Sequence, residues 1–104
     1  MEFLEPWLPV GASATQLEKE LHAELGPRHI LKGRGMRAVA MRQDCDDVLF
    51  VSSGEPRVVA VVHLTYANRP EQDPLYPETI LFESIDDWTE RGMKADHEDF
   101  FTGA

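Results

Sequence analysis

The chain has 104 residues, a mass of 11.8 kDa and ordinary globular proportions, with 42% hydrophobic and 28% charged residues. These values exclude wholesale disorder and suit a single domain over residues 1–104. The single cysteine excludes a small secreted domain stabilised by internal disulfides. No apolar run reaches the roughly 18 residues of a membrane helix, and the N-terminus is acidic, so we expect a soluble, cytoplasmic protein that does not bind membranes.

The formal net charge of -9 opposes nucleic-acid binding over the whole surface, because phosphate contacts need cations. The charge is uneven. Residues 28–42 contain five cations and no acids, whereas residues 70–104 contain ten acids and two cations. This asymmetry indicates a surface that binds a basic partner, or an acidic face that keeps the protein soluble.

Residues 1–12 contain Pro6, Pro9 and Gly11 and are expected to form an extended arm, with Trp7 packed back onto the domain. A helix is predicted over residues 14–25. Ser13 and Gln16 have the spacing of a capping box, and Gly26-Pro27 ends the segment. Its leucines recur every four residues as a buried stripe, and its other side is expected to face solvent through Glu18, Lys19, Glu20 and Glu24.

Three strands follow at short spacing, at Met36–Gln43, Asp47–Ser52 and Arg57–Tyr66, and are expected to form an antiparallel meander. Residues 58–62 are apolar at every position, which is typical of a central strand covered on both faces. The N-terminal segment, the second helix or another subunit could provide that cover.

Residues 67–78 contain three prolines and are predicted to be a long loop, either functional or packed by its own Leu75 and Tyr76. A fourth strand is predicted at Thr79–Glu83, and Ser84 caps a second helix that Gly92 weakens. Residues 95–104 are expected to be a frayed tail. The order α-β-β-β-(long loop)-β-α predicts an α+β, two-layer domain with a four-stranded antiparallel sheet.

The segments Asp44-Cys45-Asp46-Asp47-Val48-Leu49-Phe50 and Val61-Val62-His63-Leu64-Thr65-Tyr66 resemble a family of small bacterial proteins with no established activity. The likeness extends from Trp7 to the Trp88 region. It implies a bacterial, cytoplasmic, stand-alone domain and transfers no catalytic residue.

His63 is the most informative candidate for chemistry, because it lies near the end of the most apolar strand, on the same side as Val59 and Val61. A carboxylate from Asp47 or Glu83 could orient it for general acid–base catalysis. The alternative is a hydrogen-bonded structural histidine.

The acids beside Cys45 form the densest polar cluster of the chain. Asp44, Asp46 and Asp47 could bind a hard cation, although their spacing differs from a calcium loop; the alternative is an acidic β-turn. The neighbouring acids disfavour a Cys45 thiolate, and no zinc-ligand spacing is present. We therefore predict neither a metal site nor a cofactor.

The basic segment contains Gly33-Arg34-Gly35, which lacks the spacing of a phosphate-binding loop. Arg34 and Arg37 are the candidates for a local anion-binding face, the alternative being a flexible cationic connection.

The absence of a complete catalytic motif favours a non-enzymatic interaction module, which could act as an acidic inhibitor of a basic protein. The alternative is a small hydrolase or phosphodiesterase-like enzyme that uses His63 with Asp46 or Asp47. If both helices pack on one face of the sheet, the other face exposes the apolar residues of the central strand. We therefore expect a homodimer through the sheet or the Trp7 arm.

Overall fold

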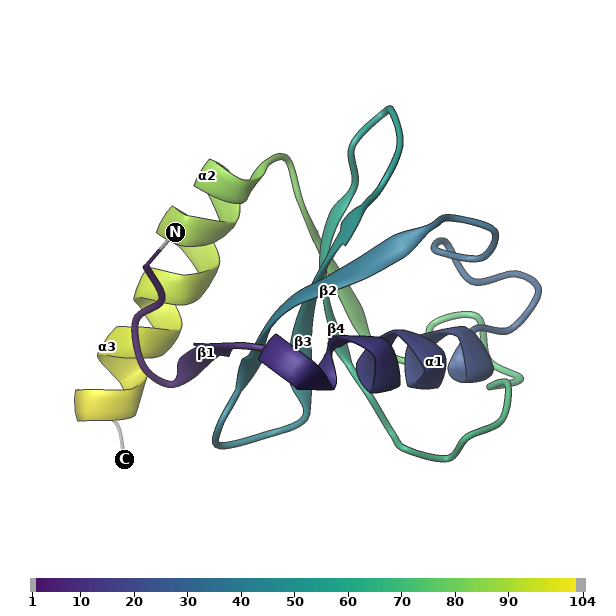
Figure 1. Cartoon of the computed structure of the whole chain (residues 1–104), viewed down its shortest axis with the longest axis horizontal. Helices are drawn as coiled ribbons and strands as arrows, with labels where there is room; N and C mark the ends of the chain where they lie inside the picture. The colour runs from purple at the N-terminus through teal and green to yellow at the C-terminus, as the bar shows by residue number, and fades with distance from the viewer. Residues whose placement is uncertain (1, 103–104) are drawn as a thin grey trace.

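The computed structural model describes residues 2–102, which form an α+β fold around an antiparallel sheet (Figure 1). Each strand pairs with the next along the chain, in the order β1 (Trp7–Pro9), β2 (Met36–Arg42), β3 (Asp47–Ser52), β4 (Val59–His63) and β5 (Thr79–Phe82). A 3-10 turn, η1 (Gly11–Ser13), leads into α1 (Ala14–Glu24). The C-terminal helix combines α2 (Ile85–Trp88), the π-turn η2 (Thr89–Met93) and α3 (Lys94–Thr102) without a break.

The sheet has five strands, so the expectation of four was wrong. The additional strand is β1, which the N-terminal arm forms by pairing Trp7 with Arg42 and Pro9 with Ala40. A strand of three residues beside prolines is too short to show an alternation of apolar and polar residues in the sequence. An edge strand tolerates proline because one side of its backbone needs no hydrogen-bond partner. Trp7 is buried, as expected.

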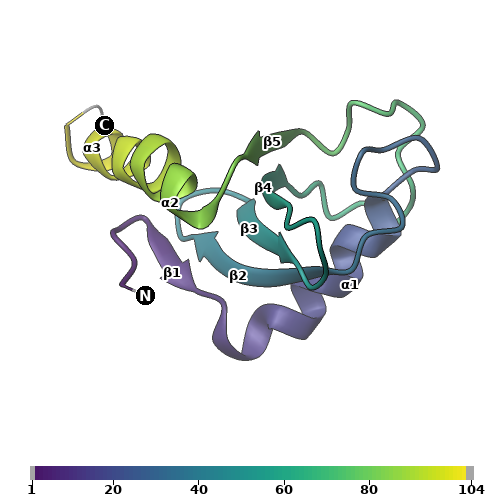
Figure 2. The ribbon, with the colours of Figure 1, turned by 90° about the horizontal axis from the view of Figure 1, so that it is seen from above.

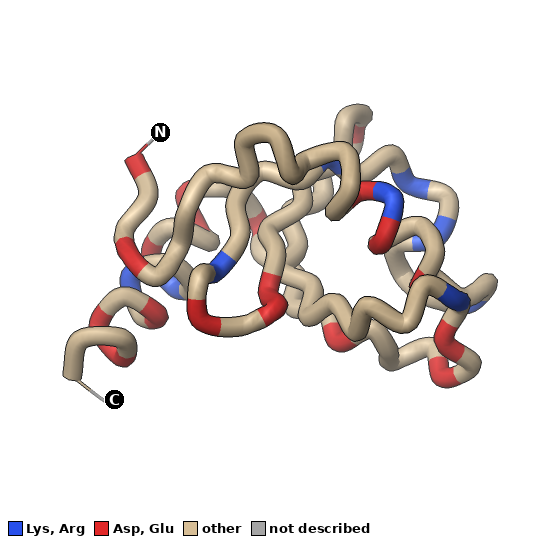
Figure 3. Tube along the Cα trace, turned by 60° about the horizontal axis from the view of Figure 1, so that its bottom comes forward, with Lys and Arg blue, Asp and Glu red and all other residues tan. Residues whose placement is uncertain are grey.

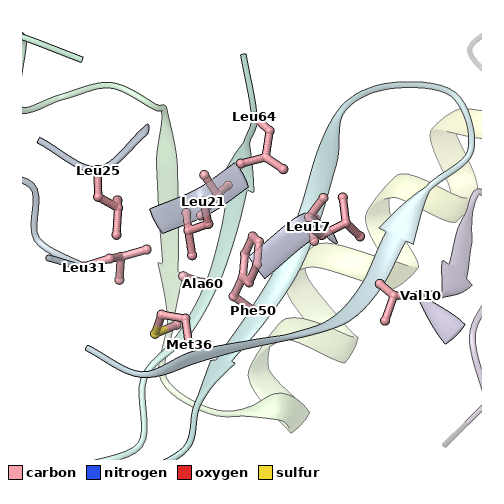
Figure 4. Close-up of a cluster of buried hydrophobic side chains, with 11 residues drawn as sticks. Val10, Leu17, Leu21, Leu25, Leu31, Met36, Phe50, Ala60 and Leu64 are labelled. Atoms are coloured by element: carbon pink, nitrogen blue, oxygen red, sulfur yellow. The ribbon is translucent and has the colours of Figure 1, made fainter. Parts of the chain in front are cut away.

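The two helical elements lie on opposite faces of the sheet, which corrects the expected two-layer arrangement (Figure 2). On one face, the leucines of α1 pack onto the strands, with Leu21 and Leu17 close to Phe50 and Ala60 (Figure 4). On the other face, the C-terminal helix contributes Trp88 to a second core, whose other members include Trp7, Leu49, Val51, Val59, Val61 and Met93.

The central strand β4 is therefore covered on both faces, and the helices provide the cover. The sequence argument for a homodimer assumed that one face is left open. That argument no longer holds, and a homodimer stays an untested prediction.

The solvent side of α1 differs from the prediction, because Glu20 and Glu24 are buried. Glu24 accepts hydrogen bonds from the backbone N–H groups of Thr65 (2.9 Å) and Tyr66 (2.8 Å), and Glu20 accepts one from Asn68 (3.0 Å). These carboxylates hold the chain that leaves β4, where backbone donors have no strand partner. The strand consequently ends at His63 rather than at Tyr66.

The two predicted helix caps have different outcomes. The Ser84 hydroxyl accepts a hydrogen bond from the Asp87 N–H at 3.0 Å, so the capping at the start of α2 is confirmed. Ser13 makes no side-chain capping bond, because its backbone already has helical angles after η1. In the loop before β5, Leu75 and Tyr76 are exposed and do not form a core of their own.

The expected frayed tail is helical as far as Thr102, while residues 103–104 lie outside the described residues. Contacts with the N-terminal arm hold this helix in place. Asp96 accepts a hydrogen bond from Trp7 Nε1 at 2.9 Å, and Leu4 N–H lies 3.4 Å from Met93 Sδ. Within residues 2–102, no helix is both long and apolar enough to cross a membrane.

Candidate functional site

His63 and Asp47 face each other across the antiparallel pair of β3 and β4, where one strand begins and the other ends. Strict alternation places both side chains on the face that carries the C-terminal helix. His63 Nδ1 and Asp47 Oδ1 are 2.7 Å apart. Of the carboxylates considered from sequence, Asp47 is the one that orients the imidazole.

The carboxylates around His63 favour its protonated form. Its pKa is raised above the ordinary value, chiefly by the hydrogen bond to Asp47 and further by the charges of Asp47, Asp46 and Glu78, although desolvation acts in the opposite direction. The His63 side chain is 52% exposed and that of Asp47 is 25% exposed. With Nδ1 engaged, Nε2 remains available to a ligand.

Two adjoining pockets, of about 340 and 230 Å³, share Asp47, Val61 and Ile80, and the first of them also contains His63. Together they form a groove between the sheet and the C-terminal helix, which we call the Asp47 groove. The sheet provides an apolar floor of Val61, Ile80 and Phe82. The remaining lining residues are His63, Glu78, Trp88, Arg91, Gly92 and Asp96.

The cation at the helical wall of the groove is already paired. Arg91 Nη2 donates to Asp87 Oδ2 at 2.7 Å, and its guanidinium lies 5.5 Å from the centre of the Phe82 ring. Asp96 is held by Trp7 and lies 3.4 Å from Arg42. Arg91 is neutralised by Asp87 and Asp96 by Arg42, both partners lying outside the lining, so the charge left inside the groove is that of Asp47, its partner His63 and Glu78.

Trp88 packs directly against Gly92 at the helical end of the groove. The Trp88 side chain is fully buried, and its Nε1 has no hydrogen-bond partner among residues 2–102. A Cβ on Gly92 would lie only 2.7 Å from Trp88 Cδ1 and 3.0 Å from Nε1. The edge of the indole therefore fills the space that a side chain at position 92 would need.

A larger pocket of about 490 Å³ lies at the β2–β3 turn and contains the predicted acidic cluster. Arg42 donates to the Asp44 carboxylate through bonds of 2.8 and 2.7 Å, and Asp47 is paired with His63. Burial and nearby acids raise the pKa of Cys45, which therefore stays a thiol. Within residues 2–102 no three His, Cys, Asp or Glu side chains are placed to hold a metal ion.

The predicted anion-binding arginines are not brought together in these pockets. Arg34 Nε donates to the Ile30 carbonyl at 3.4 Å, and Arg37 lies on β2 opposite Val51. Neither residue lines the pockets described above. The anion-binding face stays a prediction.

Several lining residues of the Asp47 groove were missed from sequence. Ile80 lies within the predicted fourth strand, and Glu78 could have been found by extending the alternation of that strand back by one residue. Trp88, Gly92 and Asp96 recur every four residues, which is the spacing of one helix face. The expectation of a frayed tail concealed that spacing.

Comparisons of the chain with protein-family models, with curated proteins and with solved structures found no match. The resemblance to a bacterial family stays a prediction, and the function is argued from the site itself.

Proposed function

We propose that the protein is a protein-binding module, and that its Asp47 groove receives a lysine or arginine side chain of a basic partner protein. The observation that carries the proposal is the combination of an apolar floor with carboxylates at the rim. Lysine and arginine have an apolar stem and a charged head, so their burial suits such a groove.

The individual groups support this assignment. Ile80 is 62% exposed and offers apolar surface to the stem, while Asp47 uses only Oδ1 for His63 and keeps Oδ2 for a cationic head. Acidic positions along the C-terminal helix (Figure 3) and the net charge of -9 would speed the approach of a basic protein.

A titration followed by ¹H–¹⁵N NMR tests the groove with two matched probes, Nα-acetyl-lysine methylamide and the corresponding norleucine derivative. We expect the lysine probe to shift Val61, Ile80 and Gly92 saturably at about 10 mM, and norleucine to bind about tenfold more weakly because it lacks the ammonium group. Asp47→Asn should weaken lysine binding. Glu55→Gln removes the same charge from an exposed position outside the lining and should have no effect.

Equal binding of the two probes would show that the carboxylates do not select cations. Shifts confined to other surfaces, or no saturable shift with lysine, would rule out the groove as the binding site.

A hydrolase is the second candidate, and the 2.7 Å contact between His63 and Asp47 favours it. His63 Nε2 would act as a general base on water, because the groove lining contains no serine, threonine or cysteine. A phosphodiester suits the site poorly, since the surrounding carboxylates repel its charge. We therefore expect a hydrolytic activity, if present, to prefer neutral esters.

Hydrolysis of p-nitrophenyl acetate tests this second candidate. A hydrolase should lose its rate in His63→Gln and keep it in His22→Gln, which removes an exposed histidine of α1. The rate should rise with pH as His63 loses its proton. Equal rates in the two variants would show that His63 has no special role and that exposed imidazoles hydrolyse the ester unspecifically.

A further inference from the structure

The strand β5 is an open edge of the sheet. Within residues 2–102 it pairs with β4 alone, and its four residues contain no proline and no lysine, two features that commonly block sheet edges. The opposite edge is different, because β1 contains Pro9 and is joined to the C-terminal helix through Trp7.

The backbone groups on the outer side of β5 follow from the register. His63 N–H donates to the Glu78 carbonyl at 2.9 Å, and Val62 is opposite Thr79. In an antiparallel pair, residues that bond to the neighbouring strand alternate with residues whose N–H and C=O point away from it. Thr79 and Leu81 therefore present their backbone groups to the outside.

The side chains of β5 leave apolar surface on both sheet faces. Ile80 is 62% exposed beside the Asp47 groove, and Leu81 is 51% exposed on the face that carries α1. A strand placed alongside, at about 4.8 Å, would satisfy the outer backbone groups and cover part of both side chains.

The charges at the two ends of β5 indicate which strand fits. Glu78 and Glu83 flank the apolar residues, and neither belongs to a salt bridge within the described part of the chain. A second copy of this chain would bring the same acids and another net charge of -9. An extended basic segment has the complementary charge.

We infer that β5 binds an extended, basic segment of the partner by strand addition, next to the groove that receives its lysine or arginine. The inference rests on the proposed function and names its binding mode. Ile80 joins the two surfaces, because it belongs to β5 and also lines the groove.

Amide hydrogen exchange tests the inference with an acetylated peptide of alternating lysine and valine. The N–H groups of Thr79 and Leu81 should exchange quickly in the free protein and at least about tenfold more slowly with the peptide, because strand pairing protects them. A peptide with proline at its central position should protect them poorly. Leu81→Pro should abolish peptide binding, whereas Leu81→Ala, which keeps the N–H, should retain most of it.

The outcomes separate this inference from the proposed function. If the lysine probe binds the groove but the peptide leaves both amides unprotected, strand addition is wrong and the groove stands. If the peptide protects the amides while the lysine probe does not bind, the edge stands and the groove proposal fails. Protection that grows with protein concentration alone, with a mass of twice 11.8 kDa, would identify a second copy as the occupant and overturn the basic segment.

Discussion

Replacing Glu24 by glutamine tests whether a buried carboxylate organises the end of β4. Glu24 is fully buried and accepts hydrogen bonds from the backbone N–H groups of Thr65, at 2.9 and 3.1 Å, and of Tyr66, at 2.8 Å. A glutamine keeps the size of the side chain but replaces one acceptor oxygen with an NH₂ group. With its oxygen at the Oε2 position, glutamine keeps the bond from Tyr66 and the 3.1 Å bond from Thr65, but its NH₂ group replaces the oxygen 2.9 Å from the Thr65 N–H and sets donor against donor.

The loss of a buried hydrogen bond together with two opposed donors lowers stability by about 1–3 kcal/mol. Taking about 2 kcal/mol for Glu24→Gln, and about 4–8 °C for each kcal/mol in a domain of this size, we expect the melting temperature to fall by about 8–16 °C. Thermal unfolding followed by circular dichroism measures the change. Glu55→Gln is the matched control, because Glu55 is exposed in the β3–β4 connection.

The pH dependence gives the same variant a second readout. Burial raises the pKa of Glu24 above 4.5, and the neighbouring Glu20 adds to the rise, although the bonds from Thr65 and Tyr66 oppose it. The folded state therefore binds the proton more tightly than the unfolded state. This part of the stability is complete below pH 4.5 and is lost as the pH rises through the folded pKa.

Glutamine does not titrate, so the deficit of the variant should be larger at pH 5 than at pH 8. A loss of stability in Glu24→Gln that grows with pH would show that the bonds from the backbone donors lower the Glu24 pKa more than burial raises it. A melting temperature equal to that of the Glu55 control would refute the role given to Glu24.

Four other outcomes are expected. Leu21→Asp places an unpaired charge in the α1 core and should lower stability by about 4 kcal/mol in a urea titration; an unchanged midpoint would contradict the helix face. Gly92→Ala crowds Trp88 and should lower the free energy of unfolding, measured by urea titration, by about 1 kcal/mol, because overpacking exceeds the gain in helix propensity; a higher free energy would argue against the close packing of Trp88 on Gly92. Zinc should leave the melting temperature unchanged, and an increase that Cys45→Ser abolishes would reveal a site. Binding of the lysine probe should strengthen from pH 6 to pH 8 as His63⁺ loses its proton, and His63→Gln should remove this dependence. Affinity that does not change with pH in the unmodified protein would show that the lysine ammonium binds away from His63.

Local patterns were sufficient to predict several elements. The leucine spacing of α1, the Ser84 cap and the three-strand meander each depend on residues close together in the chain. The pairing of His63 with Asp47 was also accessible, since the short connection between β3 and β4 limits which residues face each other.

Features that depend on distant segments could not be predicted in this way. The burial of Glu24 requires backbone donors more than 40 positions later in the chain. The burial of Trp88 between the sheet and the N-terminal arm depends on which face the C-terminal helix covers, and two helices of similar pattern can share a face or divide the two faces. The Asp47 groove is a product of that choice.

The link between the N-terminal arm and the C-terminal helix sets an order on folding during synthesis. Trp7 is translated early, but it packs against Trp88, with ring centres 5.2 Å apart, and donates to Asp96. The α1 core can close once β4 has been made, whereas the second core must wait for Trp88, which lies 81 residues after Trp7. Until that helix arrives, the apolar face of the sheet that will carry the groove remains open to chaperones and to neighbouring chains.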